Sequence, residues 1–163
     1  MNERTNVTRG LAQRLSSAFW IVLPFGAAAL ATGAQPGDWY AALNKPTWNP
    51  PNWLFGPVWF ALYLMMGFAA AKVWNAGTPA RRAPLGWFCV QLALNALWSW
   101  VFFGWHQMGW ALVNLIALCV AVLITMLEFR RVRPAAGALL MPYFAWVCFA
   151  AVLNFTVWRL NQG

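Results

Sequence analysis

Five long apolar stretches follow one another along this chain of 163 residues, separated by short segments rich in proline, glycine and charged residues. A bilayer core about 30 Å thick needs about 20 helical residues at a rise of about 1.5 Å each. Each stretch has about that length, so the pattern predicts an all-α protein, a single membrane domain over residues 1–163 with five transmembrane helices. We expect these helices at about residues 15–33, 53–74, 85–105, 110–127 and 134–158.

Three prolines, Pro24, Pro57 and Pro142, lie inside the predicted helices. Membrane helices tolerate proline because neighbouring groups satisfy the carbonyl that it leaves unpaired, and we expect kinks at these positions. The composition agrees with a lipid environment, since 62% of the residues are hydrophobic and only 9% are charged. A soluble domain has about 25% charged residues, so these counts exclude an ordinary soluble fold.

The basic residues are sorted between alternate connections. Nine of the eleven precede the first helix or lie between the second and third or the fourth and fifth, whereas the other connections hold only Lys45 and Arg159. By the positive-inside rule, this places the N-terminus in the cytoplasm and the C-terminus outside, in what we expect to be a bacterial inner membrane. Basic residues spread over connectors, despite the net charge of +8, do not form the cationic face of a nucleic-acid-binding protein. The nine are Arg4, Arg9, Arg14, Lys72, Arg81, Arg82, Arg130, Arg131 and Arg133.

The first apolar stretch has an alternative interpretation. A basic start, an apolar run and a small-residue segment, Ala31–Ala34, are also typical of a cleaved signal peptide. The stretch is long enough to span the bilayer, and the charge pattern of four remaining helices would need no exported start. We therefore favour a transmembrane helix.

The residues that carry most enzyme chemistry are few and scattered. The chain has one histidine, His106, in a connector, and its three acidic residues lie away from helix centres. Its three cysteines fall in three different apolar stretches, without the spacing of a zinc or redox motif. We therefore expect no catalytic residues and no metal site, which argues against a hydrolase or a proton-coupled transporter. The cysteines are Cys89, Cys119 and Cys148.

Aromatic and amide side chains recur at helical spacing in three of the stretches. Facing inward, such stripes would line an apolar cavity with a few polar groups, which suits a flat small molecule. The alternative is that the amides only hold the helices together by hydrogen bonds. The stripes are Trp59, Tyr63 and Met66, then Gln91, Asn95, Trp98 and Phe102, and finally Tyr143, Trp146, Ala150 and Asn154.

The first loop, residues 34–52, is long and contains three aromatic residues, Trp39, Tyr40 and Trp48, among several prolines. One interpretation is a loop anchored among lipid headgroups. The other is a lid that folds over the mouth of the bundle, in which Lys45 would meet an anionic group of a ligand.

Three motifs resemble the tryptophan-rich sensory protein and translocator protein family, which includes the peripheral benzodiazepine receptor. They are the loop segment Leu43–Pro51, the segment Gln91–Gly104 with its Asn95, Trp98 and Phe102, and the segment Pro142–Asn161. The resemblance implies a five-helix bundle, usually a homodimer. It also implies a pocket beneath the first loop that binds porphyrins such as protoporphyrin and haem, benzodiazepine-like ligands and, in some members, sterols. A required cofactor is not implied.

The resemblance implies which residues form the site. The binding residues would be Trp48, Tyr63, Asn95, Trp98, Trp146, Ala150 and Asn154. The lid would comprise Trp39, Tyr40, Lys45, Pro46, Asn49, Pro50 and Pro51. We therefore expect a membrane receptor or carrier for tetrapyrroles with a sensory or regulatory role.

Two residues depart from the family pattern. Thr47 stands where some relatives carry a further tryptophan, so light-dependent porphyrin breakdown that used that ring would be absent here. Phe155 replaces the tyrosine of a sterol-recognition pattern, which is itself a weak signal. A light-dependent porphyrin-degrading enzyme, a porphyrin or sterol transporter and a purely structural bundle remain the alternatives.

Overall fold

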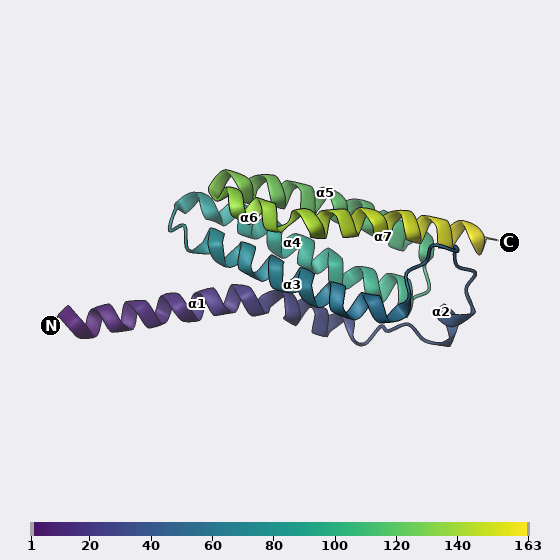
Figure 1. The fold of residues 1–163 in the computed structure, drawn as a ribbon, viewed down its shortest axis with the longest axis horizontal. Helices are drawn as coiled ribbons and strands as arrows, with labels where there is room; N and C mark the ends of the chain where they lie inside the picture. The colour runs from purple at the N-terminus through teal and green to yellow at the C-terminus, as the bar shows by residue number, and fades with distance from the viewer. Residues whose placement is uncertain (1, 163) are drawn as a thin grey trace.

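Five helical spans run side by side in the computed structural model, which describes the backbone of residues 2–162 and the side chains of residues 13–162 (Figure 1). Within that part of the chain, five helices are long and apolar enough to cross a membrane. The predicted all-α, five-helix architecture is therefore confirmed. The spans are α1 (Asn2–Ala31), α3 (Asn52–Trp74), α4 (Arg82–Ser99), α5 (Met108–Val132) and the pair α6 (Pro134–Leu139) and α7 (Met141–Leu160).

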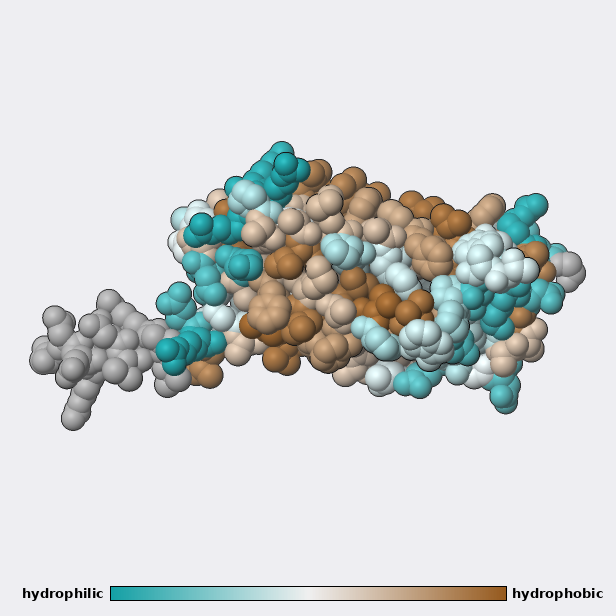
Figure 2. Space-filling view, viewed as in Figure 1, coloured by the Kyte–Doolittle hydropathy of each residue, from teal (hydrophilic) through white to brown (hydrophobic). Residues whose placement is uncertain are grey.

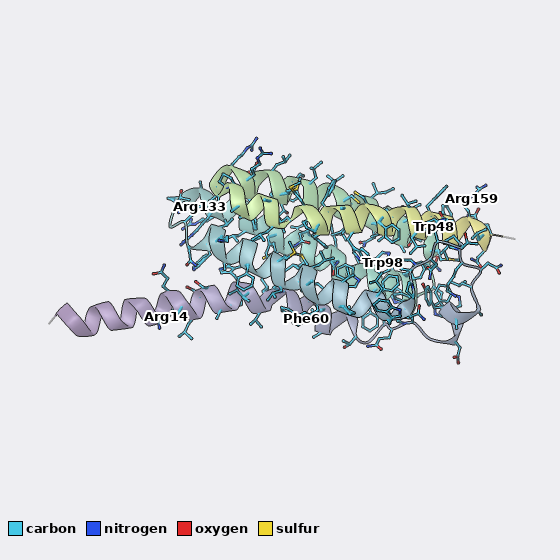
Figure 3. The ribbon with its side chains drawn as sticks, in the orientation of Figure 1. Arg14, Trp48, Phe60, Trp98, Arg133 and Arg159 are labelled. Carbon is cyan, nitrogen blue, oxygen red and sulfur yellow. The ribbon has the colours of Figure 1, made fainter. Side chains whose placement is uncertain are left out.

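The surface of the bundle has an apolar middle and polar ends, as expected for a protein that spans a membrane. On the face that Figure 2 shows, hydrophobic side chains cover most of the middle of the bundle, and hydrophilic ones gather towards both ends. Apolar side chains along the middle point outward, among them Phe60 at 61% exposure and Ile116 at 55%. Such a surface would be costly in water and is suited to lipid. Arg14 and Arg133 lie towards one end of the molecule and Arg159 at the other (Figure 3), so the charge sorting along the sequence corresponds to two ends in space.

The first helix is longer than its apolar stretch. It begins at Asn2 rather than near Leu15, and it ends at Ala31. Its N-terminal part runs beyond the other helices (Figure 1). An apolar pattern marks the part of a helix that contacts lipid or protein, whereas backbone hydrogen bonding continues through polar residues with good helix propensity. The described apolar span, Gln13–Ala31, agrees with the predicted one.

The fifth span consists of two helices, α6 and α7, with an interruption shortly before Pro142. The helix is interrupted at Leu140, and Pro142 lies in the first turn of α7. Because proline lacks a backbone N–H, it cannot continue the hydrogen bonding from the preceding turn, and Leu140 instead donates to Gly137 over 3.1 Å. By contrast, α1 and α3 continue through Pro24 and Pro57.

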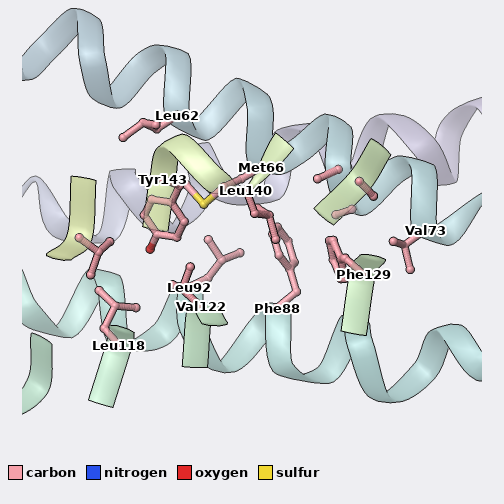
Figure 4. Packing of buried hydrophobic residues seen from close by; sticks show 14 of the residues in the cluster. Leu62, Met66, Val73, Phe88, Leu92, Leu118, Val122, Phe129, Leu140 and Tyr143 are labelled. Atoms are coloured by element: carbon pink, nitrogen blue, oxygen red, sulfur yellow. The ribbon is translucent and has the colours of Figure 1, made fainter. Parts of the chain in front are cut away.

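A small cluster of buried hydrophobic side chains packs against the first loop, and the larger core lies in the rest of the bundle. Met66 and Phe88 from α3 and α4 are fully buried there with Phe129 of α5 (Figure 4). The rings of Phe88 and Phe129 stack with centroids 5.7 Å apart. On α3, a Cβ at Gly67 would lie 2.5 Å from the carbonyl oxygen of Ile21. The absence of a side chain at Gly67 therefore lets α1 approach α3 closely.

At the other end, α4 passes into a wider turn. The π-helical turn η2 (Trp100–Gly104) closes with a hydrogen bond from the Trp105 N–H to the Trp100 carbonyl, 2.8 Å long. The indole of Trp100 also donates to the Leu30 carbonyl over 2.9 Å and lies against Gly33, where a Cβ would come within 2.8 Å of the ring. Trp100 therefore fastens the end of α1 to η2.

Candidate ligand-binding site

A cavity of about 580 Å³ opens between the helices beneath the first loop, in the half of the molecule that holds Trp98 and Trp48 (Figure 3). Residues at the end of α1, in the loop, and on α3, α4, η2, α5 and α7 line it. None of these lining residues, all of which lie in the described part of the chain, is aspartate, glutamate, lysine, arginine or histidine. The aromatic members of the lining are Tyr40, Phe55, Trp59, Tyr63, Trp98, Phe102, Phe103, Trp146 and Phe149.

Four of the cavity rings form two stacked pairs, one on α3 and the other on α4 and η2. Trp59 and Tyr63 of α3 stack with centroids 5.2 Å apart and planes inclined by 28°. Trp98 of α4 and Phe102 of η2 stack at 5.3 Å and 26°. Stacked pairs present flat, apolar faces, which favour flat aromatic ligands through offset or edge-on contact.

Four polar side chains of the lining are joined in two hydrogen-bonded pairs, Tyr63 with Asn95 and Trp98 with Asn154. The Tyr63 hydroxyl donates to the Asn95 side-chain oxygen over 3.1 Å, and the Asn95 amide nitrogen donates to the Tyr143 hydroxyl over 3.2 Å. The Trp98 indole donates to the Asn154 side-chain oxygen over 3.3 Å, and the Asn154 amide donates to the Met108 carbonyl over 2.9 Å. The amides therefore both hold helices together and supply the polar part of the wall.

The structure brings six of the seven predicted binding residues together in this lining. They are Tyr63, Asn95, Trp98, Trp146, Ala150 and Asn154. The seventh, Trp48, lies outside the lining. Its ring meets the lining residue Phe149 edge-on at 5.9 Å, and 45% of the side chain is exposed. Trp48 therefore contacts a residue of the cavity wall without facing the cavity itself.

The first loop covers one side of the bundle end through its short helix α2 (Asp38–Ala42). Trp39 stacks on His106 with centroids 4.1 Å apart, and Tyr40 meets Phe103 edge-on at 5.3 Å. Of the predicted lid residues, only Tyr40 lines the cavity. Burial raises the pKa of the Tyr40 phenol, an effect that a hydrogen bond with Asn49 partly offsets.

The charged member of the predicted lid faces the loop itself. Lys45 donates from its Nζ to the carbonyls of Ala41 and Leu43, over 3.2 and 3.1 Å, and lies 4.6 Å from the centre of the Tyr40 ring. It is not among the lining residues. The remaining lid residues, Pro46, Asn49, Pro50 and Pro51, also lie outside the lining and shape the backbone of the loop.

The loop is tied to the C-terminal end of α7 by a reciprocal pair of hydrogen bonds. The Asn44 N–H donates to the side-chain oxygen of Asn161 over 3.0 Å, and the Asn161 amide donates to the Asn44 carbonyl over 2.9 Å. The same amide also donates to the Val157 carbonyl over 2.7 Å. Residues 117 positions apart in the sequence thereby fix the position of the loop.

Several lining residues were not predicted. Leu115 and Leu118 of α5 and Thr32 after α1 contribute to the cavity. The fourth apolar stretch has no aromatic-and-amide stripe, so its periodicity did not distinguish a cavity face from a lipid face. The end of α1 carries only small residues there, and no pattern indicated that they face a cavity.

The sequence matches known proteins along most of its length. The model of the TspO/MBR family matches residues 17–159. The chain is 47% identical to the translocator protein of Homo sapiens over 128 residues, which cover 77% of this chain and 76% of that protein. It is 43% identical to the CrtK protein of Rhodobacter capsulatus over 141 residues, 84% of this chain and 88% of that protein. It is 43% identical to the tryptophan-rich protein TspO of Chlorobaculum tepidum over 150 residues, 90% of this chain and 95% of that protein.

Proposed function

The chain belongs to the TspO/MBR family, and from this premise we propose that it is a membrane receptor for flat tetrapyrroles such as protoporphyrin and haem. The single observation that carries the proposal is the uncharged cavity of about 580 Å³, with its stacked rings beneath the first loop. A ligand of several fused or conjugated rings gains both apolar burial and ring contacts in such a site. Benzodiazepine-like compounds, which are smaller and also flat in part, suit the same walls.

The cavity sets the orientation of a porphyrin. The two carboxylates of protoporphyrin would lose hydration without gaining a charged partner if they entered an uncharged lining. They therefore stay at the mouth, near the loop and water, while the apolar edge of the macrocycle enters between Trp98 and Trp146. The hydrogen-bonded pair of Asn95 and Tyr63 faces that edge.

We expect the cavity to bind metal-free porphyrin and haem with similar affinity. The lining has no histidine, cysteine or methionine among the described residues. These residues, and in some proteins tyrosine, are the protein ligands of haem iron. The hydroxyl of the lining residue Tyr63 already donates to Asn95, and burial raises the pKa of the Tyr40 phenol, which disfavours the phenolate that would bind iron. The porphyrin plane, rather than the metal, is then the group that is recognised. Neither form acts as a cofactor in this proposal.

A sensory role fits this chemistry. Four of the seven proposed binding residues are joined in pairs by hydrogen bonds, Tyr63 with Asn95 and Trp98 with Asn154. The acid–base pairs that a proton-driven carrier needs are missing from the described lining. Relatives carry names of both kinds, a tryptophan-rich sensory protein in Cereibacter sphaeroides, 41% identical over 136 residues, and a translocator protein in Homo sapiens. Measurement of protoporphyrin flux across the membrane of proteoliposomes distinguishes a receptor from a transporter, because a receptor binds the ligand without moving it along a gradient.

The membrane placement and the assembly belong to the same proposal. The charge sorting supports an inner membrane with the N-terminus in the cytoplasm and the C-terminus outside. The family supports a homodimer. Cross-linking in native membranes, followed by denaturing gel electrophoresis, tests the dimer, since a monomer would give no product of twice the mass.

Titration with protoporphyrin, followed by quenching of tryptophan fluorescence, tests the binding. Ring contacts are worth about 0.5–1.5 kcal/mol each, so Trp146→Ala is expected to weaken binding by about 2- to 12-fold. Asn95→Ala is expected to weaken it as well. Trp110→Ala is the matched control, because Trp110 is 69% exposed and lies outside the lining. Equal affinity in all three variants would remove the cavity as the binding site.

A further inference from the structure

Two cysteines that are far apart in the sequence lie close together about halfway along the length of the bundle. The Sγ atoms of Cys119 on α5 and Cys148 on α7 lie 4.0 Å apart. The third cysteine, Cys89 on α4, is exposed. Their spacing along the chain does not predict any pairing, since each lies in a different apolar stretch.

The pair is open to the lipid phase and lies near mid-depth. Cys119 is close to the midpoint of α5 (Met108–Val132), and Cys148 is close to the midpoint of the α6 and α7 span, Pro134–Leu160. Both side chains are partly exposed. On the same two helices, Ile116 and Val152 are 55% and 58% exposed to the outside. A lipid-soluble reagent therefore reaches these thiols from the hydrocarbon.

We propose that Cys119 and Cys148 form an oxidation site, at which a lipid-soluble hydroperoxide produces a disulfide between α5 and α7. The sulfur of one thiol attacks the terminal peroxide oxygen while its proton passes to the leaving oxygen, so no separated charge persists; the O–O bond breaks, and a sulfenic acid and an alcohol form. The second thiol then attacks the sulfenic sulfur, the S–S bond forms and water leaves. Two thiols are oxidised and one hydroperoxide is reduced to an alcohol and water, which balances the reaction.

The geometry favours this product over further oxidation. A disulfide needs the sulfurs about 2.05 Å apart, so they approach by about 2 Å through rotation of the two side chains and small helix shifts. Because the second thiol is already 4.0 Å from the first, it intercepts the sulfenic acid before more oxygen is added.

Charge favours the disulfide over a metal complex. A soft metal ion needs deprotonated thiols, and separated charge is costly at the centre of a bilayer. Conversion of two neutral thiols to a neutral disulfide leaves no charge in the hydrocarbon. The pair is therefore better suited to oxidation than to metal binding.

The bond would join two walls of the cavity. Leu118 precedes Cys119 and Val147 precedes Cys148, and both Leu118 and Val147 line the cavity. A crosslink between α5 and α7 would restrict how far those walls can separate. This consequence for ligand binding rests on the proposed function, whereas the oxidation itself does not.

The test treats the full chain in phospholipid nanodiscs with cumene hydroperoxide and measures the intact mass and the peptides after digestion. We expect the loss of two hydrogen atoms, a peptide that links Cys119 to Cys148, and reversal by a membrane-permeant phosphine. Cys119→Ser and Cys148→Ser should each abolish the linked peptide, and Cys89→Ser, the matched control, should retain it.

Other products overturn the proposal. These are unmodified thiols at both positions, oxygen atoms added to Cys119 or Cys148 separately, and links that involve Cys89. Cys89 is the more exposed thiol, so selective linkage of the other two would come from their proximity and not from access alone. Protoporphyrin binding, measured on the reduced protein, tests the proposed function independently.

Discussion

The hydroxyl of Tyr63 on α3 donates a hydrogen bond to the side-chain oxygen of Asn95 on α4, 3.1 Å away. The amide nitrogen of Asn95 donates in turn to the hydroxyl of Tyr143 on α7. One amide thereby joins three helices, and it also faces the cavity. In the proposed function, stability and ligand recognition would consequently depend on the same side chain.

Replacing Asn95 by alanine leaves the hydroxyls of Tyr63 and Tyr143 without this partner. Interhelical hydrogen bonds in membranes contribute about 0.6 kcal/mol on average and up to about 1.7 kcal/mol, so we expect the free energy of unfolding to fall by about 1–3 kcal/mol. Tyr63→Phe should cost less, because the ring and its stacking on Trp59 remain. Unfolding in mixed micelles measures both.

The double variant Tyr63→Phe with Asn95→Ala completes this comparison. Since the two side chains share one hydrogen bond, the double variant should lose less stability than the sum of the single variants. If the stability losses of the two single variants simply added up in the double variant, the result would contradict the hydrogen bond between Tyr63 and Asn95.

Haem and metal-free protoporphyrin should bind with affinities within a few fold of each other. The described lining offers no histidine, cysteine or methionine to the iron, and the hydroxyl of its Tyr63 is bonded to Asn95, so we expect the metal to gain no protein ligand. Parallel fluorescence titrations measure the two affinities, and the visible absorption spectrum reports iron coordination. A strong preference for haem, with a spectrum typical of a histidine or thiolate ligand, would argue against this cavity.

The interior of the bundle was more predictable than the loop above it. Asn95, Trp98, Trp146 and Asn154 recur at helical spacing, and helical periodicity fixes which residues share a face. That face proved to line the cavity. Periodicity along the chain therefore identified eight of the 25 lining residues, whereas three other stripe residues, Met66, Gln91 and Tyr143, are buried outside the lining.

The loop has no such periodicity. Its course depends on long-range contacts, such as Asn44 with Asn161 and Trp39 with His106, which no local pattern encodes. For this reason Lys45 was expected to meet a ligand, whereas the structure places its Nζ on carbonyls of the loop itself. The position of Trp48 behind Phe149 depends on the same fold of the loop.

Gly67 should tolerate a side chain poorly. A Cβ there would lie 2.5 Å from the carbonyl oxygen of Ile21, so Gly67→Ala must push α1 away from α3. We expect a loss of about 1–3 kcal/mol of stability, typical of overpacking, measured as a shift in the unfolding transition. Gly86→Ala is the matched control, since nothing lies within 4 Å of its added Cβ. An equal effect of the two substitutions would contradict the close packing of α1 on α3.

The two ends of the chain should lie on opposite sides of the membrane. An odd number of spans requires this, and the termini lie at opposite ends of the molecule (Figure 1). Fusion of a reporter that is active only in the cytoplasm should give signal at the N-terminus and none at the C-terminus. Signal at both ends would contradict five spans, and signal at the C-terminus alone would reverse the orientation.

Filling the cavity tests the central claim most directly. Ala150 on α7 lines the cavity, so Ala150→Phe adds a ring to the space that a ligand would occupy. Ala145→Phe, on the exposed side of the same helix, is the matched control. We expect Ala150→Phe to weaken protoporphyrin binding by at least ~10-fold, a loss of about 1.4 kcal/mol, with little change in the unfolding transition, and Ala145→Phe to bind as the parent does. Undiminished binding by a folded Ala150→Phe variant would contradict the account.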